Sequence, residues 1–143
     1  MINNVQSFYE SLGKYGCYYL LLLHIGAKKE LTTEELYLLS CQFHELGWLH
    51  FNKKDLSDPD NFFVQSPSNI LDVLTERKYT VRKESADYIP QKNEIEILFY
   101  ALNRENADKG IGHFRMKDYD TLQNSNTVKK GKVYSKRIIK EIV

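Results

Sequence analysis

Apolar residues in the first half of the chain recur at spacings of three and four, which is typical of helices. We expect helices over Val5–Leu12, Cys17–Ile25 and Thr32–Leu46, and a short fourth helix that starts at Ser66-Pro67, because proline is tolerated in a first turn. The buried faces of the third and fourth helices are predicted to consist of Leu36, Leu39, Phe43 and Leu46, and of Ile70, Leu71 and Leu74.

Local signals mark the ends of these helices. The segment Gly13 to Gly16 holds two glycines in four residues, which favours a turn, so we expect a break just before Cys17. The segment Cys17–Ile25 is apolar on nearly all sides, which in a soluble protein indicates a helix enclosed by other elements. Thr32 and Glu35 have the spacing of a capping box.

After Tyr79 the pattern changes to alternating or β-rich runs. Strands are predicted over Tyr79–Lys83, Glu94–Tyr100, Gly112–Lys117 and Lys132–Ile142, and Trp48–Phe51 could form a further short strand. Helices first and strands afterwards is the order of an α+β domain, with amino-terminal helices packed on a carboxy-terminal antiparallel sheet. A length of 143 residues predicts one domain spanning residues 1–143, since domains commonly have ~100–150 residues.

Composition narrows the function classes. Hydrophobic residues make up 42% and charged residues 27%, which excludes wholesale disorder. Lys and Arg number 20 and Asp and Glu 19, a net charge of +1, which argues against a nucleic-acid coat protein or a membrane-surface binder. The longest apolar run, Tyr18 to Leu23, is far shorter than the ~20 residues of a spanning helix, and the amino terminus does not resemble a secretory signal. We therefore expect a cytoplasmic protein with free thiols and no membrane partner.

The candidate chemistry is that of a nucleophilic cysteine. Cys17 is predicted to begin a helix, where unpaired amides favour the thiolate, and the preceding glycines would let backbone amides approach a bound carbonyl. His113, in a predicted strand, is the preferred base. Asp120 would orient the imidazole if the chain reverses tightly around Lys117 and Asp118. Asp118 and Asn124 are the other choices for this third role, and the chemistry needs no cofactor or metal.

These residues, with the late Gly-His-Phe strand, the Tyr-Asp pair and the ending Ser125 to Arg137, resemble small papain-like proteins of the bacteriocin-processing peptidase type. More narrowly, they resemble an uncharacterised family of spirochaete plasmids and prophage-like elements. The resemblance spans Gly16 to Ile139. It implies a papain-like fold, a peptide or protein substrate, and the roles of nucleophile, base and orienting group for Cys17, His113 and Asp120. The oxyanion glutamine of the papain pattern is missing before the cysteine, so an inactive relative is also open.

Single cysteine and histidine residues also allow interpretations other than the catalytic roles given above. Cys17 could be a small buried hydrophobe, and His24 is a weaker candidate for the base. Cys41, His44 and His50 loosely suggest a metal site, but structural zinc requires four closely spaced ligands.

The stretch from Val128 to Val143 is basic. It carries a net charge of +5 from Lys129, Lys130, Lys132, Lys136, Arg137, Lys140 and Glu141. We interpret it as a solvated edge strand. The alternative function is a non-catalytic nucleic-acid- or protein-binding protein of a mobile element, for which this stretch would contact phosphates. The oligomeric state is not predicted by the sequence.

Overall fold

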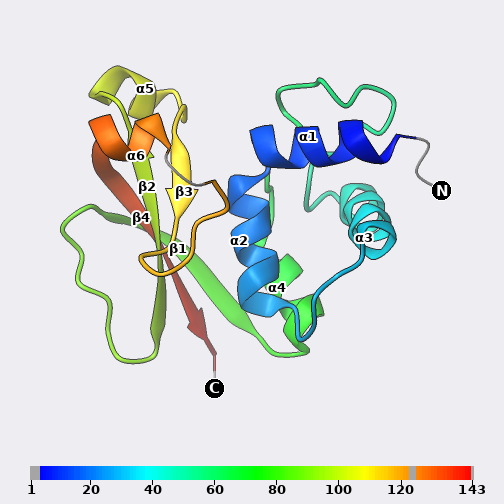
Figure 1. Ribbon diagram of the computed structural model, residues 1–143. Coiled ribbons are helices and arrows are strands. Elements are labelled where there is room, and N and C mark those ends of the chain that lie inside the picture. Colours follow the sequence, from blue (N-terminus) through cyan, green and yellow to red (C-terminus); the bar gives the residue numbers. More distant parts are fainter. Residues whose placement is uncertain (1–3, 123–124, 143) are drawn as a thin grey trace. The chain divides into compact units, whose positions relative to one another are not determined.

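The computed structural model describes residues 4–122 and 125–142, and the chain divides into two compact units, residues 1–76 and 77–143 (Figure 1). The first unit is helical and the second holds the sheet, so the predicted α+β class with an antiparallel sheet is confirmed. Packing of the helices on the sheet, and a single domain, stay predictions. None of the helices in the described parts of the chain combines the length and apolar character that crossing a bilayer requires.

The described residues of the first unit, from residue 4 on, form four helices and the loops between them. The helices are α1 (Val5–Tyr15), α2 (Cys17–Gly26), α3 (Thr33–Glu45) and α4 (Pro67–Thr75). The predicted turn over Gly13 to Gly16 is wrong, because α1 runs through Gly13 to Tyr15. Nothing lies within 4 Å of a Cβ built on Gly13, whereas a Cβ on Gly16 would lie 2.7 Å from the carbonyl oxygen of Leu12. The break before Cys17 is therefore the single residue Gly16.

Helix α3 begins and ends where its sequence signals predict. The hydroxyl of Thr32 accepts from the amide of Glu35, and the carboxylate of Glu35 accepts from the amide of Thr32. The bond from the amide of Thr32 is the main reason that the pKa of Glu35 falls to about 2, and a hydrogen bond from Lys29 is the next largest cause. Gly47 follows the helix with φ of +77°, a conformation that glycine adopts at little cost. Leu36 and Phe43 are buried, but Leu46 is half exposed, so its predicted place on the buried face is wrong.

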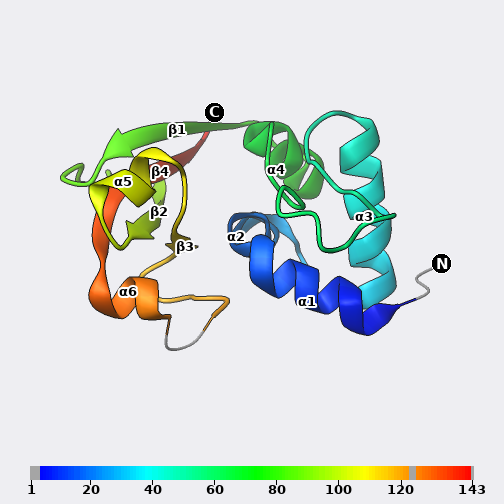
Figure 2. The same cartoon turned by 90° about the horizontal axis from the view of Figure 1, so that it is seen from above.

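Aromatic rings form the centre of the first unit. Tyr19 of α2 stacks on Phe62 with ring centroids 5.7 Å apart, and Phe8 of α1 meets Phe51 and Phe62 edge to face. Figure 2 shows α3 lying across the amino-terminal part of α1, where Phe8 packs edge to face on Tyr37. The predicted strand Trp48–Phe51 is reduced to one bridge, which pairs Leu49 with Val64.

The second unit is a four-stranded antiparallel sheet in the order β1-β4-β2-β3. Its strands are β1 (Tyr79–Ser85), β2 (Glu94–Ala101), β3 (His113–Arg115) and β4 (Lys132–Glu141). The basic strand β4 pairs with β1 on one side and β2 on the other. Its interpretation as an edge strand is therefore wrong.

Two short helices in this unit are absent from the sequence prediction. Helix α5 (Arg104–Asp108) follows β2 and α6 (Asn126–Lys130) precedes β4, and both lie at one end of the sheet (Figure 1). Each is a single five-residue turn, too short to show an apolar period. Their caps are visible in the sequence, because the side chains of Asn103 and Ser125 accept from backbone amides three residues on.

Candidate functional site

The imidazole of His113 and the carboxylate of Asp120 form a close pair in the second unit. His113 Nε2 lies 2.6 Å from Asp120 Oδ1, and the two side chains are 7% and 17% exposed. Because a carboxylate only accepts, Nε2 carries the hydrogen of this bond. In the neutral ring the basic lone pair then belongs to Nδ1. The pair therefore has the form of a base whose tautomer is set by a half-buried acid.

A tight turn explains how residues seven apart come together. The backbone groups of Met116 and Tyr119 bond reciprocally, at 2.9 and 3.4 Å, so that the chain reverses around Lys117 and Asp118. Continuing this register outward places Asp120 opposite Arg115 and on a diagonal from His113. Diagonal neighbours in a hairpin lie ~7–8 Å apart, within reach of long side chains.

The strand that carries His113 is held close to its neighbour. His113 pairs with Tyr100 of β2, and the adjacent Phe114 packs on Phe99 with ring centroids 4.7 Å apart. Gly112 comes directly before this strand, where an added Cβ would overlap the carbonyl oxygen of Tyr100. The small residue thus permits the close approach that fixes the backbone of His113.

Asp120 has further partners that the sequence did not indicate. Its Oδ1 atom also accepts from the amide of Leu122 at 3.1 Å, and its Oδ2 atom lies 3.5 Å from Nε of Arg115. Alternation along β3 could have suggested Arg115, because residues two apart share a face of a strand. The alternatives for the third role differ: Asp118 lies at the exposed tip of the turn, and Asn124 lies outside the described residues.

Cys17 is the first residue of α2 and a half-buried free thiol. This is the location expected for a nucleophile at a helix start. Cys17 belongs to the first unit, whereas His113 and Asp120 belong to the second. The structure thus brings together two of the three predicted site residues, and the approach of the thiol to His113 stays a prediction. His24, the weaker candidate for the base, is exposed in the last turn of α2.

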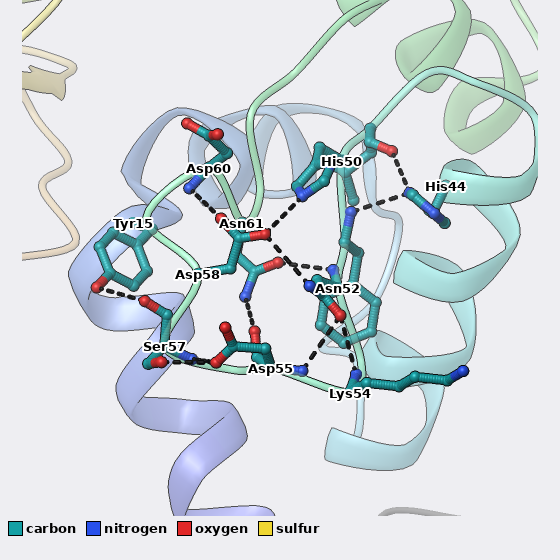
Figure 3. Close-up of polar contacts among 12 residues, drawn as sticks. Tyr15, His44, His50, Asn52, Lys54, Asp55, Ser57, Asp58, Asp60 and Asn61 are labelled. Carbon is teal, nitrogen blue, oxygen red and sulfur yellow. Dashed lines mark hydrogen bonds and ion pairs between the residues drawn. The ribbon is translucent and has the colours of Figure 1, made fainter.

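The histidines of the suggested metal site have structural partners (Figure 3). Nδ1 of His44 accepts from the amide of Phe51 at 3.0 Å. Nε2 of His50 lies 2.9 Å from Asp58 Oδ2, and this hydrogen bond is the main reason that the pKa of Asp58 is lowered. Within residues 4–122 and 125–142, no three His, Cys, Asp or Glu side chains gather as the ligands of one ion would.

The loop of residues 52–61 is organised by its own polar groups (Figure 3). Asn61 is 1% exposed, accepts from the amide of Asn52 at 2.6 Å and donates to the carbonyl oxygen of Asp55 at 3.0 Å. The carboxylate of Asp55 accepts from the amide and the hydroxyl of Ser57. The side chains of Asn61 and Asp55 therefore serve to shape the loop.

Part of the basic stretch is used within the sheet. Lys136 Nζ lies 2.7 Å from Glu96 Oε2 and donates to the carbonyl oxygen of Tyr88 at 2.7 Å. The guanidinium of Arg137 lies over the ring of Phe114, 5.3 Å from its centroid. The net charge of this stretch thus overstates what it offers to an outside anion.

No curated protein and no solved structure matches the chain significantly. A family with the description "Protein of unknown function, DUF261" matches residues 1–141. Since the match covers nearly the whole chain, this protein belongs to the DUF261 family.

Proposed function

We propose that the protein is a papain-like cysteine hydrolase that cleaves peptide or amide bonds. Cys17 is the nucleophile, His113 the general base and Asp120 the group that orients the imidazole. The observation that carries the proposal is the 2.6 Å bond between His113 Nε2 and Asp120 Oδ1, because it directs the basic lone pair to Nδ1. The location of Cys17 at the start of α2 supports it further.

In the proposed reaction, Nδ1 of His113 takes the thiol proton as the sulfur of Cys17 bonds to the substrate carbonyl carbon. Backbone amides at the start of α2 supply donors for the oxyanion. His113 then gives its proton to the amine as the carbon–nitrogen bond breaks, which leaves a thioester. Water transfers a proton to Nδ1 and attacks that carbonyl. The carbon–sulfur bond breaks, the acid leaves, and the thiol regains its proton.

The alkylation rate of Cys17 as a function of pH tests the pairing, with peptide mass spectrometry to separate the two cysteines. An ordinary thiol, with a pKa of ~8.5, is about 1% thiolate at pH 6.5. If His113 takes the proton, iodoacetamide should modify Cys17 at pH 6.5 about tenfold faster than Cys41 or more. His113→Gln should abolish this advantage and leave the rate at Cys41 unchanged.

Two outcomes would count against the proposal. One is a pH profile of Cys17 that matches Cys41, and the other is a profile of Cys17 that His113→Gln does not change. A thiol-directed acylating probe provides the second test, since labelling should be lost in Cys17→Ala and retained in Cys41→Ala. Rapid alkylation of Cys17 without turnover of the acylated protein would indicate an inactive relative.

A further inference from the structure

The guanidinium of Arg115 contacts both the turn around Lys117 and Asp118 and the carboxylate of Asp120 that follows it. Its Nε donates to the carbonyl oxygen of Met116 at 3.1 Å and lies 3.5 Å from Asp120 Oδ2. One of its terminal nitrogens donates to the carbonyl oxygen of Lys117 at 3.3 Å. One side chain therefore joins the backbone carbonyls of Met116 and Lys117, at the start of the turn, to the carboxylate of Asp120 that follows it.

The contacts of Arg115 matter because the segment that carries Asp120 lies outside the strands of the sheet. Strand β3 ends at Arg115, and Tyr119 to Leu122 are not part of a strand. Here the backbone groups of Met116 and Tyr119 bond reciprocally, and the amide of Leu122 donates to the Asp120 carboxylate itself. The partners of the carboxylate, His113, Arg115 and the amide of Leu122, thus contribute to fixing its location.

Arg115 and His113 approach the same carboxylate from one strand. They are two residues apart in β3, so their side chains leave the same face of the sheet. The carboxylate uses Oδ1 for His113 and Oδ2 for Arg115. With Oδ2 held beside the guanidinium, Oδ1 is directed at the imidazole. A planar guanidinium can bond several acceptors in fixed directions, which a lysine ammonium cannot do in the same way.

We propose that Arg115 is a positioning residue that holds Asp120 against Nε2 of His113. This inference deepens the proposed function and rests on it for its catalytic meaning, since Arg115 acts through Asp120 on the general base. The geometry of the His113–Asp120 pair can, however, be measured whether or not the protein is an enzyme. A failure of the inference about Arg115 can therefore be distinguished from a failure of the proposed function.

The test is NMR of the His113 Nε2 proton in the full chain carrying Cys17→Ala, so that the thiol does not contribute. A hydrogen bond to a charged group is worth more than a factor of ten in an equilibrium. Arg115→Met should therefore speed exchange of this proton with water about tenfold or more, towards the rate in Asp120→Asn. Arg115→Lys should recover part of the protection. Arg104→Met is the control, because Arg104 is in α5 and pairs with the exposed Asp108.

A folded Arg115→Met protein in which this proton exchanges as slowly as in the parent would overturn the inference. If Arg115→Met does not fold, Arg115→Lys decides, since unchanged exchange there would mean that the fork of the guanidinium is not needed. In the chain with Cys17 intact, Arg115→Met should also lower the alkylation rate of Cys17 at pH 6.5. Faster proton exchange without this loss would leave Arg115 as the positioning residue and count against the proposed function.

Discussion

Gly112 lies so close to the carbonyl oxygen of Tyr100 that a side chain at position 112 would overlap it. The same added Cβ would approach the ring of Phe99 to 2.7 Å. We expect Gly112→Ala to push β3 away from β2 and to destabilise the protein by about 1–3 kcal/mol, the usual range for overpacking. It should also change the NMR signals of the His113 ring. Urea unfolding measures the first effect, and unchanged stability would contradict it.

Gly13→Ala is the matched control, and we expect it to stabilise the protein where Gly112→Ala destabilises it. Gly13 lies inside α1 and has open space around the location of a Cβ. Replacing glycine by alanine within a helix stabilises it by about 1 kcal/mol. The same urea experiment should therefore show a higher midpoint, and a lower one would mean that α1 does not continue through this residue.

A chain of hydrogen bonds links α2 to α3 inside the first unit. The hydroxyl of Ser40 donates to the carbonyl oxygen of Leu36 at 2.8 Å, so the hydroxyl of Tyr19 donates to Ser40, 3.1 Å away. Burial of Tyr19 raises the pKa of its phenol. Ser40→Ala would leave that phenol buried without a partner, at a cost of about 1–3 kcal/mol. Tyr19→Phe should cost less, and equal losses in thermal unfolding would contradict this order.

Glu94 predicts a specific response to acid. Its carboxylate accepts from the amide of Gln91, from the phenol of Tyr88 and from Arg82, and these bonds lower its pKa from 4.5 to about 2. A depressed pKa in the folded state contributes stability above the ordinary value, and this contribution is lost as pH falls from about 4.5 to 2. We therefore expect Glu94→Gln to be less stable than the parent at pH 7, with a difference that shrinks as pH approaches 2.

Urea midpoints at pH 7, 4 and 2.5 would measure this difference. Glu105→Gln serves as the control, because its ion pair with Lys109 is exposed and such pairs contribute little. A constant difference between Glu94→Gln and the parent across this range would refute the prediction.

The cap of α3 predicts a contrast between two helix starts. The side chain of Thr32 accepts from the amide of Glu35, whereas Ser66, which precedes α4, makes no such capping bond. Thr32→Ala should therefore destabilise the protein by about 1 kcal/mol, and Ser66→Ala should have little effect. Thermal unfolding of both variants tests the contrast, and equal losses would refute it.

The sequence predicts most of the fold because its strongest signals are local. Helix α3 carries both an apolar period and a capping box, and the four strands of the sheet follow alternating runs. Gly13 and Gly16 look alike in sequence, yet only Gly16 meets a neighbouring backbone atom in the fold. The order of strands is a non-local property, so the alternation of β4 could not distinguish an edge strand from a central one.

The candidate site, like the fold, was predictable from the sequence where its contacts are local. The turn at Lys117 and Asp118 is a local feature, so Asp120 could be placed near His113 from the sequence alone. Arg115 was missed because its role depends on the carbonyl groups of Met116 and Lys117, which its guanidinium can bond together only once the turn has formed. The pairing of Cys17 with His113 joins distant parts of the chain, and no local pattern can establish it.

The location of β4 between β1 and β2 has a consequence for biosynthesis. Of the four strands, β4 is made last, and β1 is joined to β2 only through it. On the ribosome, the complete four-stranded sheet can therefore form only after residues 132–141 have left the exit tunnel. A nascent chain arrested near Gly131 would expose to chaperones and proteases the edges of β1 and β2 that later pair with β4.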